Sequence, residues 1–235
     1  MFRCSSDGST NLNTAKIAGV GYHHGDLRAA LLDAAESLVR ERGVDGWSLR
    51  EVSARIGVSP SAAYHHFKSR DALVGALSAQ VLARLGERVR KAAARARGQR
   101  DDPQSRVIAL CRSYVRWTVE DPSVAGLTFG AHHDEAETPV SPHPHDVLAA
   151  ELDRLVEAGG LTVSARTGAE FVVWPAVHGL ATLLRDGLMR LDNARDVDAQ
   201  VERLIRAVLT GLREETSPHR PQARSAHTEH LAADR

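Results

Sequence analysis

The chain is poor in cysteine, in aromatic residues and in long apolar runs. Its 235 residues include two cysteines, too few for a disulfide scaffold, and no charged-then-apolar leader is recognisable, so we expect a reducing cytoplasm. The longest apolar stretch, around residues 171–184, is interrupted by Pro175 and His178 and is too short to span a bilayer, which excludes membrane insertion. Aromatic residues make up 4% of the chain. Because Ala, Leu, Arg and Glu abound instead, we predict an all-α fold.

Motifs that carry catalysis are also missing. The sequence has no Gly-x-Ser-x-Gly elbow, no phosphate-binding glycine loop before a lysine and no His-Glu-x-x-His zinc helix. We therefore expect no enzyme, since a helical enzyme would need polar groups converging in a cleft. A metal site could draw on the histidine-rich segment His132, His133, Asp134, Glu135, His143 and His145. Its spacing is irregular, so we expect a solvated loop, no metal and no other cofactor.

Charge divides the chain into two parts although the formal net charge is zero. Residues 1–100 hold 16 basic and 9 acidic residues, a net charge of +7, and residues 101–235 carry the opposite net charge of −7. A basic first part favours contact with a polyanion, whereas an acidic second part repels one. Two modules are predicted, unless this modest imbalance is accidental.

Start signals for three short helices follow one another in the first module. An apolar face begins at Asp26 and ends at Gly43, and Ser48 with Glu51 forms a capping box for a second helix. After a turn at Gly57, Ser59 and Pro60 are typical of an N-cap and first helical residue, which places a third helix at about residues 60–67. This spacing favours a helix-turn-helix, whose second helix fits the major groove, although many such pairs only pack.

The remaining chain is predicted to be helical with unstructured ends. A long helix begins at Ser69 and Asp71 and ends near Gly98, and its arginine-rich second half could contact phosphate but more readily connects the modules. The predicted organisation is a disordered arm at 1–20, a DNA-binding domain at 21–70, a connecting helix at 71–98, an effector-binding and dimerisation domain at 99–214, and a disordered tail at 215–235. Cys111 is expected on the buried side of its helix.

The last two predicted helices each carry two apolar rows. One neighbour cannot cover stripes that wide, which predicts a four-helix interface with a second copy of the chain. The alternative is that both helices are buried centrally in a monomer. The interface candidates are Val173, Val177, Leu180, Leu184, Leu188, Val201, Leu204, Ile205, Val208 and Leu212.

Three segments in order carry a family resemblance. They are residues 22–28 (YHHGDLR), residues 48–59 with SLREVS and IGVS, and residues 63–73 (AYHHFKSRDAL). Together they closely resemble the DNA-binding domain of the TetR family of bacterial transcription regulators. Further on, Trp174 with His178-Gly179-Leu180 resembles the Trp-His-Gly signature of one carboxy-terminal class in that family.

The resemblance implies a homodimer that places its third helices in successive major grooves of double-stranded operator DNA. Ser48 would touch phosphate, Ser61 and Ala62 would meet base edges, and Lys68 would contact phosphate. Family members often have Lys, Gly or Thr where this chain has Pro60, Ser61 and Ala62, so few polar groups are left for base contacts. The full set of predicted DNA-binding residues is Ser48, Arg50, Ser59, Pro60, Ser61, Ala62, Tyr64, His65 and Lys68, and Phe67 is expected in the core.

The resemblance also implies a small-molecule effector in the carboxy-terminal domain. Candidate pocket residues are Trp117, Phe129, Phe171, Trp174 and His178, although aromatic residues at helical spacing are usually plain core. Pro175 should kink its helix and open space for the ligand. We expect a ligand-released repressor. The alternative is a DNA-binding module whose carboxy-terminal domain recruits a protein partner.

Overall fold

A computed structural model describes residues 24–96, 102–128 and 140–214 of the chain, and every regular element in these ranges is helical, as expected. The helices are α1 (His24–Arg42), α2 (Leu49–Arg55), α3 (Pro60–His66), α4 (Arg70–Arg95), α5 (Ser105–Glu120), α6 (Pro122–Leu127), α7 (Pro144–Glu157), α8 (Val163–Arg166), α9 (Glu170–Arg185) and α10 (Ala194–Glu214). The predicted arm at 1–20 and tail at 215–235 lie outside the described residues. No helix in the described ranges is long and apolar enough to cross a membrane.

Local capping explains where α2, α3 and α4 begin. The hydroxyls of Ser48, Ser59 and Ser69 each accept a hydrogen bond from the backbone N–H three residues later. The capping box of Ser48 and Glu51 is complete, which confirms the sequence signal. Gly57, at φ +72°, makes the turn between α2 and α3 in a conformation that other residues rarely adopt. The helix-turn-helix is therefore specified by side chains close in sequence.

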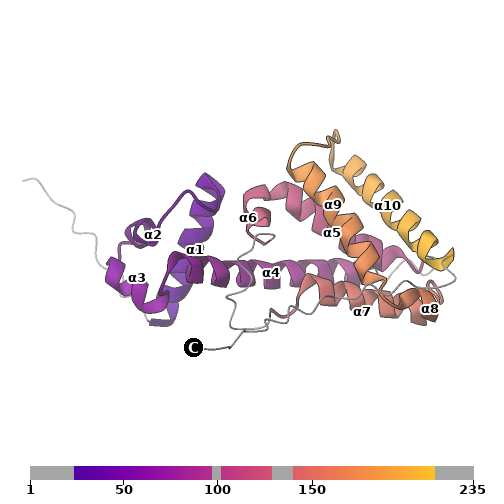
Figure 1. The fold of residues 1–235 in the computed structure, drawn as a ribbon, viewed down its shortest axis with the longest axis horizontal. Helices are drawn as coiled ribbons and strands as arrows, with labels where there is room; N and C mark the ends of the chain where they lie inside the picture. Colours follow the sequence, from indigo (N-terminus) through magenta and orange to yellow (C-terminus); the bar gives the residue numbers. More distant parts are fainter. Residues whose placement is uncertain (1–23, 97–101, 129–139, 215–235) are drawn as a thin grey trace, which may run out of the picture.

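Helix α4 joins two hydrophobic clusters that lie toward opposite ends of the molecule (Figure 1). The amino-terminal cluster takes α4 residues from Leu73 to Val81 and packs them against α1, α2 and α3. The carboxy-terminal cluster takes α4 residues from Leu85 to Ala93 and packs them against α5, α7, α9 and α10. One continuous helix thus contributes to both cores, which makes it a stiff mechanical link.

Helix α6 belongs to the first core although it follows α5 in the chain. Its Val124 and Leu127 are buried in the amino-terminal cluster. At the corner before α6, Asp121 accepts a 2.9 Å hydrogen bond from Arg40 of α1. Trp117 of α5 is partly buried against both clusters. Periodicity gave no sign of this arrangement, since it shows which face of a helix is apolar and not which neighbour covers that face.

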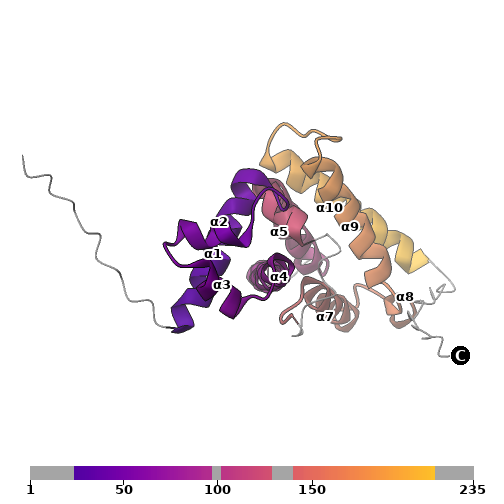
Figure 2. The same cartoon turned by 60° about the vertical axis from the view of Figure 1, so that its left-hand side comes forward.

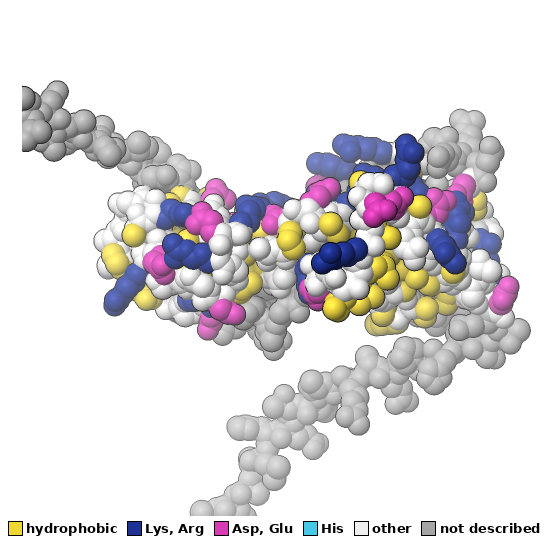
Figure 3. Space-filling view, turned by 90° about the horizontal axis from the view of Figure 1, so that it is seen from above, with side chains coloured by type: hydrophobic (Ala, Val, Ile, Leu, Met, Phe, Trp, Pro, Cys, Tyr) yellow, Lys and Arg dark blue, Asp and Glu magenta, His cyan; other side chains and the backbone are white. Residues whose placement is uncertain are grey.

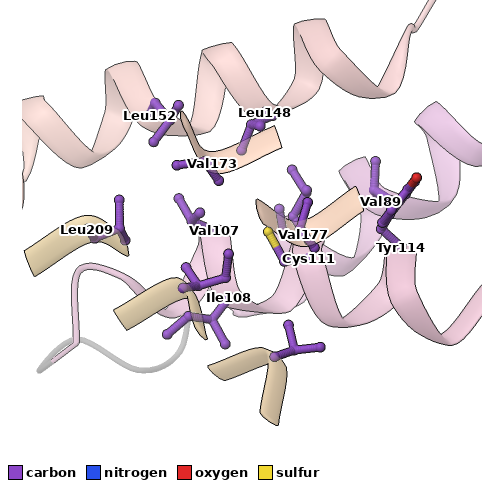
Figure 4. Close-up of a cluster of buried hydrophobic side chains, with 14 of the residues drawn as sticks. Val89, Val107, Ile108, Cys111, Tyr114, Leu148, Leu152, Val173, Val177 and Leu209 are labelled. Carbon is purple, nitrogen blue, oxygen red and sulfur yellow. The ribbon is translucent and has the colours of Figure 1, made fainter. Parts of the chain in front are cut away.

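The carboxy-terminal cluster is tightly filled around α5. Cys111 lies among Ile108, Val177 and neighbouring aliphatic side chains (Figure 4). It has no exposed surface, and burial raises the pKa of its thiol to about 12. As expected, this cysteine is a small buried hydrophobe. The short helix α8, begun by the Thr162 hydroxyl cap, was not anticipated from the sequence.

Most of the ten residues predicted for the dimer interface on α9 and α10 pack against the core of their own subunit. Six of these candidates are buried within the subunit, each with an exposure of 6% or less: Val173, Val177, Leu180, Val201, Ile205 and Leu212. Leu184, Leu204 and Val208 are half-buried against the same core. Leu188 lies beyond α9 and is 75% exposed. The six buried side chains are therefore part of the subunit's own core.

Helix α9 continues as α-helix on both sides of Pro175. Its ring is exposed, so it occupies the outer face of the helix and not the face that packs on α5. The carboxy-terminal core on the inner face is filled by Val173 and Val177, which have 0% and 1% exposure. The expectation that this proline opens space for a ligand therefore finds no support in the packing around it.

Candidate functional site

Helix α3 lies at the end of the molecule opposite α10, beside α2 and the start of α4 (Figure 2). Most residues predicted to contact DNA are exposed there. Tyr64 is 46% exposed, and Ser61, His65 and Lys68 are exposed as well, while Ala62 is half-buried. The opposite side of the helix turns Ala63 into the core, together with Phe67 just beyond its end, which confirms the expectation for Phe67. One face of α3 is therefore exposed to solvent.

Hydrogen bonding already occupies part of this surface. The Ser48 hydroxyl donates to Glu51 at 2.9 Å and accepts from its backbone N–H at 3.3 Å. Glu51 also accepts a 2.7 Å hydrogen bond from Arg42. The Ser48 hydroxyl bond and the Arg42 guanidinium hold the pKa of Glu51 below its ordinary value. A carboxylate therefore sits where Ser48 was expected to meet phosphate, and a phosphate there would have to displace or avoid it.

Arg70, at the start of α4, fixes the loop that precedes α2. Its guanidinium lies over the Trp47 ring, 4.7 Å from the centroid. It also donates to the backbone carbonyl of Trp47 at 3.1 Å and to that of Val44. Five donors in a planar fork suit this combination of stacking and carbonyl bonding. Arg70 is therefore a positioning residue, because it ties the α1–α2 loop to α4.

A second cluster of polar and aromatic side chains lies between α5, α7 and α9. The Tyr114 hydroxyl is 2.8 Å from Nδ1 of His178. The rings of Trp174 and His178 are nearly parallel, with centroids 6.2 Å apart, and Tyr114 meets Trp174 at 5.0 Å. His145 approaches Trp174 and Phe171, both at 6.1 Å. We call these five residues the aromatic cluster.

Burial and charge set the protonation of this cluster. Partial burial, followed by the positive charge of Arg185, lowers the pKa of His178. Burial raises the pKa of Tyr114. At neutral pH a neutral imidazole therefore meets a neutral phenol. The pair thus joins a buried phenol to a half-buried imidazole beside the Trp174 ring.

Three of the five predicted pocket residues come together in the aromatic cluster: Phe171, Trp174 and His178. Trp117 lies instead at the junction of the two cores, and Phe129 lies outside the described residues. Tyr114 and His145 were missed by sequence reasoning. Tyr114 precedes Trp117 by one helical turn of α5, so its position on the apolar face was a usable signal, whereas nothing in the sequence brings His145 to α9.

The metal hypothesis has no structural counterpart in the described ranges. His132, His133, Asp134 and Glu135 fall outside them. Nδ1 of His143 accepts from the backbone N–H of His145 at 3.2 Å and so caps α7. Where the chain is described, no group of three His, Cys, Asp or Glu residues is close enough to hold a metal ion.

The outer face of α9 exposes apolar side chains, and apolar side chains gather on the carboxy-terminal half of the molecule in Figure 3. Val172 and Leu183 are 45% and 39% exposed and stand on one side of α9 with Pro175 and Gly179. A Cβ added at Gly179, or at Gly211 of α10, would meet no atom within 4 Å. The surface is thus apolar and open to close approach.

Comparison with known proteins gives two family matches. Residues 31–77 match the family model for "Bacterial regulatory proteins, tetR family". Residues 107–208 match the model for "Tetracyclin repressor-like, C-terminal domain". The first match runs from within α1 through α2 and α3 to the start of α4, and the second runs from α5 into α10. Together they cover more than half of the chain.

Individual relatives agree with these matches. The HTH-type transcriptional regulator YobS of Bacillus subtilis is 22% identical over 77% of this chain and 90% of its own length. The class D tetracycline repressor of Escherichia coli is 37% identical, over 24% of this chain and 26% of its own. A Rhodococcus sp. RHA1 structure is 29% identical with a TM-score of 0.64, covering 83% of this chain and all of that one. The complex of RolR with resorcinol has a TM-score of 0.57 at 21% identity, covering 83% of this chain and 97% of RolR.

Proposed function

This chain belongs to the TetR family of DNA-binding transcription regulators and is not an enzyme; from that premise we propose that it is a repressor, released from its operator by a small molecule. It acts as a homodimer on a palindromic site, in the cytoplasm. The observation that carries the proposal is the open face of α3, which lies inside the segment that matches the family model.

The DNA-binding part of the proposal assigns α3 to the major groove. Ser61 and Tyr64 reach base edges or phosphate, Ala62 meets a thymine methyl, and Lys68 contacts phosphate. Arg50, Ser59, Pro60 and His65 flank this face, and all four are exposed. Ser48 contributes through its position at the start of α2, with Glu51 competing for the same place.

Dimerisation is assigned to the exposed apolar face of α9 together with half-buried side chains of α10. Val172 and Leu183 supply the apolar contact, and the two open glycines let the helices approach. Half-buried Leu184, Leu204 and Val208, with exposed Leu188, can add to its edges. Paired subunits would present their α3 helices about 34–36 Å apart, the separation of successive major grooves.

The effector is assigned to the aromatic cluster, where half-buried Trp174 and His178 lie ring against ring and the buried Tyr114 hydroxyl holds His178 in place. RolR, a protein of the same fold, was solved with the aromatic molecule resorcinol, which supports a small aromatic effector here. Binding favours a domain arrangement in which the α3 helices no longer match adjacent grooves, a population shift carried by α4. We also assign Trp174, His178 and Gly179 to the Trp-His-Gly signature.

One experiment tests the whole proposal. Purified protein selects bound fragments from the source genome, and the bound duplex is then used to screen aromatic metabolites for release. We expect an imperfect palindrome and at least one releasing compound, whose effect is reduced by Trp174→Ala. No retardation of any fragment at low ionic strength would overturn the DNA-binding assignment of α3.

The second candidate function is recruitment of a protein partner by the carboxy-terminal domain. The exposed apolar face of α9 favours it, because such a face suits either a second copy of the chain or a different protein. Light scattering of the purified chain distinguishes homodimerisation from partner recruitment, because in a homodimer the second copy of the chain covers that face. A monomer that binds DNA would support the partner instead.

A further inference from the structure

A groove of about 610 Å³ runs along α4, on the side that contacts the segment before α7. Its volume is in the range of small-molecule sites. It is separate from the aromatic cluster, because the two share no residue. The lining residues are Gln80, Ala83, Arg84, Glu87, Arg88, Lys91, Arg95, Ser141 and Pro142.

The positive charge of the first hundred residues is concentrated in this part of the chain. Residues 1–83 hold nine basic and eight acidic residues, a net charge of only +1, whereas residues 84–100 hold seven basic residues and one acidic residue. The net charge of residues 1–100 therefore does not mark the predicted DNA-binding domain at 21–70 by itself. Most of that excess charge belongs to the distal half of α4 and the residues just after it.

Three cations stand along one side of the groove at helical spacing. Arg88, Lys91 and Arg95 follow at intervals of three and four residues, which places them over roughly 10 Å of helix rise. Arg88 is bonded to Glu120 at 2.7 Å, and Lys91 is 3.3 Å from Glu87. Arg95 forms no ion pair with any residue that the structure describes. Each cation therefore keeps donors that its neighbours do not use.

A single carboxylate interrupts this row. Glu87 lines the groove between Arg84 and Arg88, and its two oxygens accept 2.7 Å hydrogen bonds from Arg90. The Arg90 hydrogen bond, with support from Lys91, lowers the pKa of Glu87 to about 2, so the group stays charged at neutral pH. The groove thus holds four cations against one anion, and Glu87 opposes any further negative charge.

Operator DNA does not explain these cations. Arg95 follows Arg70 by 25 residues, which is about 37 Å along the helix axis. Helix α4 leads away from α3 into the other module (Figure 1). A duplex seated on α3 would therefore lie at the far end of α4 from Arg88, Lys91 and Arg95.

The opposite wall depends on a glycine in α4. A Cβ added at Gly86 would lie 1.9 Å from the carbonyl oxygen of Pro142 and 2.7 Å from its carbonyl carbon. Only a residue without a side chain lets the segment at Ser141 and Pro142 lie this close to α4. The groove is thus built by a specific close approach.

We propose that this groove binds a small polyanion, a molecule with two or more carboxylate or phosphate groups, through Arg88, Lys91 and Arg95. Guanidinium groups match both kinds of oxyanion in a two-pronged geometry, and a nearby lysine adds a point charge. The ligand bridges α4 to the segment before α7. The assignment does not depend on what the aromatic cluster binds.

Calorimetric titration of the full chain with citrate and with pyrophosphate tests the proposal, and the two probes distinguish carboxylate from phosphate preference. We expect saturable binding of at least one probe, weakened at least tenfold in the triple variant R88A/K91A/R95A. The control R195A/R203A removes two exposed α10 arginines and should leave affinity unchanged. No saturable binding, or equal loss in both variants, would overturn the site.

Two further variants test the same site if the triple variant does not fold. Glu87→Gln removes the opposing carboxylate and should tighten probe binding several-fold, which a purely structural role of the cations would not produce. Gly86→Ala changes no charge but displaces Pro142, and should weaken binding. Retardation of duplex DNA by the triple variant should equal that of the parent chain; a loss would assign these cations to nucleic acid instead.

Discussion

Helix α3 and the distal half of α4 differ in their content of basic side chains. Helix α3 presents small and aromatic side chains, with Lys68 just past its end, and has no arginine or lysine within it. Distal α4 is dense in arginine. Yet it is α3 that lies in the segment matching the DNA-binding family model throughout. Total charge therefore does not mark the proposed DNA-binding surface, which lies on the capped helix pair α2 and α3.

The largest expected effect comes from preventing dimerisation, which should weaken operator binding by α3 but not ligand binding at distal α4. In V172E/L183E, carboxylates enter the apolar face of α9, and burying them in an interface is strongly unfavourable. We expect a monomer whose operator affinity falls by about 100-fold, or roughly 2.7 kcal/mol. Polyanion binding in the α4 groove should persist, because that site lies within one subunit. Size-exclusion chromatography with light scattering and gel retardation measure the two outcomes.

A second test compares the two ends of α4. Arg70→Ala removes carbonyl hydrogen bonds and the stacking on Trp47, and should lower the free energy of unfolding by about 2 kcal/mol. For a chain of this size the melting temperature should fall by roughly 4–8 °C. Arg95→Ala is the matched control and should melt like the parent. Equal melting temperatures for the two variants would remove the positioning role of Arg70.

A third test compares phosphate contacts. Lys68→Ala should weaken binding to all duplexes and reduce the slope of log affinity against log salt by about one unit, because one fewer counterion is released. Arg88→Ala should leave that slope unchanged. Fluorescence anisotropy at several salt concentrations gives both slopes. A slope that falls for Arg88→Ala and not for Lys68→Ala would reverse the comparison.

The smallest effect concerns pH. The pKa of His178 is lowered from 6.5 in the folded protein, so below pH 6.5 the unfolded chain takes up a proton before the folded chain does. The free energy of unfolding should therefore decrease as the pH falls from about 6.5 through the folded-state value. In His178→Asn this part of the dependence should be absent. Urea titrations of both proteins between pH 7.5 and 5 measure it.

Much of the amino-terminal module could be predicted because its signals are local. Ser48 with Glu51, Ser59 with Pro60, and Ser69 each act on a backbone N–H within three residues, so the sequence alone places the starts of α2, α3 and α4. The α3 face follows from those starts. The burial of Phe67 was expected from the family resemblance and not from these caps.

The carboxy-terminal site could be predicted only in part because its contacts are long-range. Trp174 and His178 are one turn apart and were found together, whereas Tyr114 reaches His178 across 64 positions. On α9, periodicity identified two apolar rows but could not tell that Val173 and Val177 would turn inward. Which row is buried depends on how α5 and α10 pack against α9, and no local sequence signal determines that packing.

The placement of α6 has a practical consequence for dividing the protein. Val124 and Leu127 complete the core around α1 and α4, although they come after the whole of α5 in the chain. A fragment that ends after α4 would lack Val124 and Leu127 and would expose the apolar side chains that they cover. The smallest autonomous DNA-binding unit is thus discontinuous, and isolating it requires grafting the 122–127 segment back or retaining the full polypeptide.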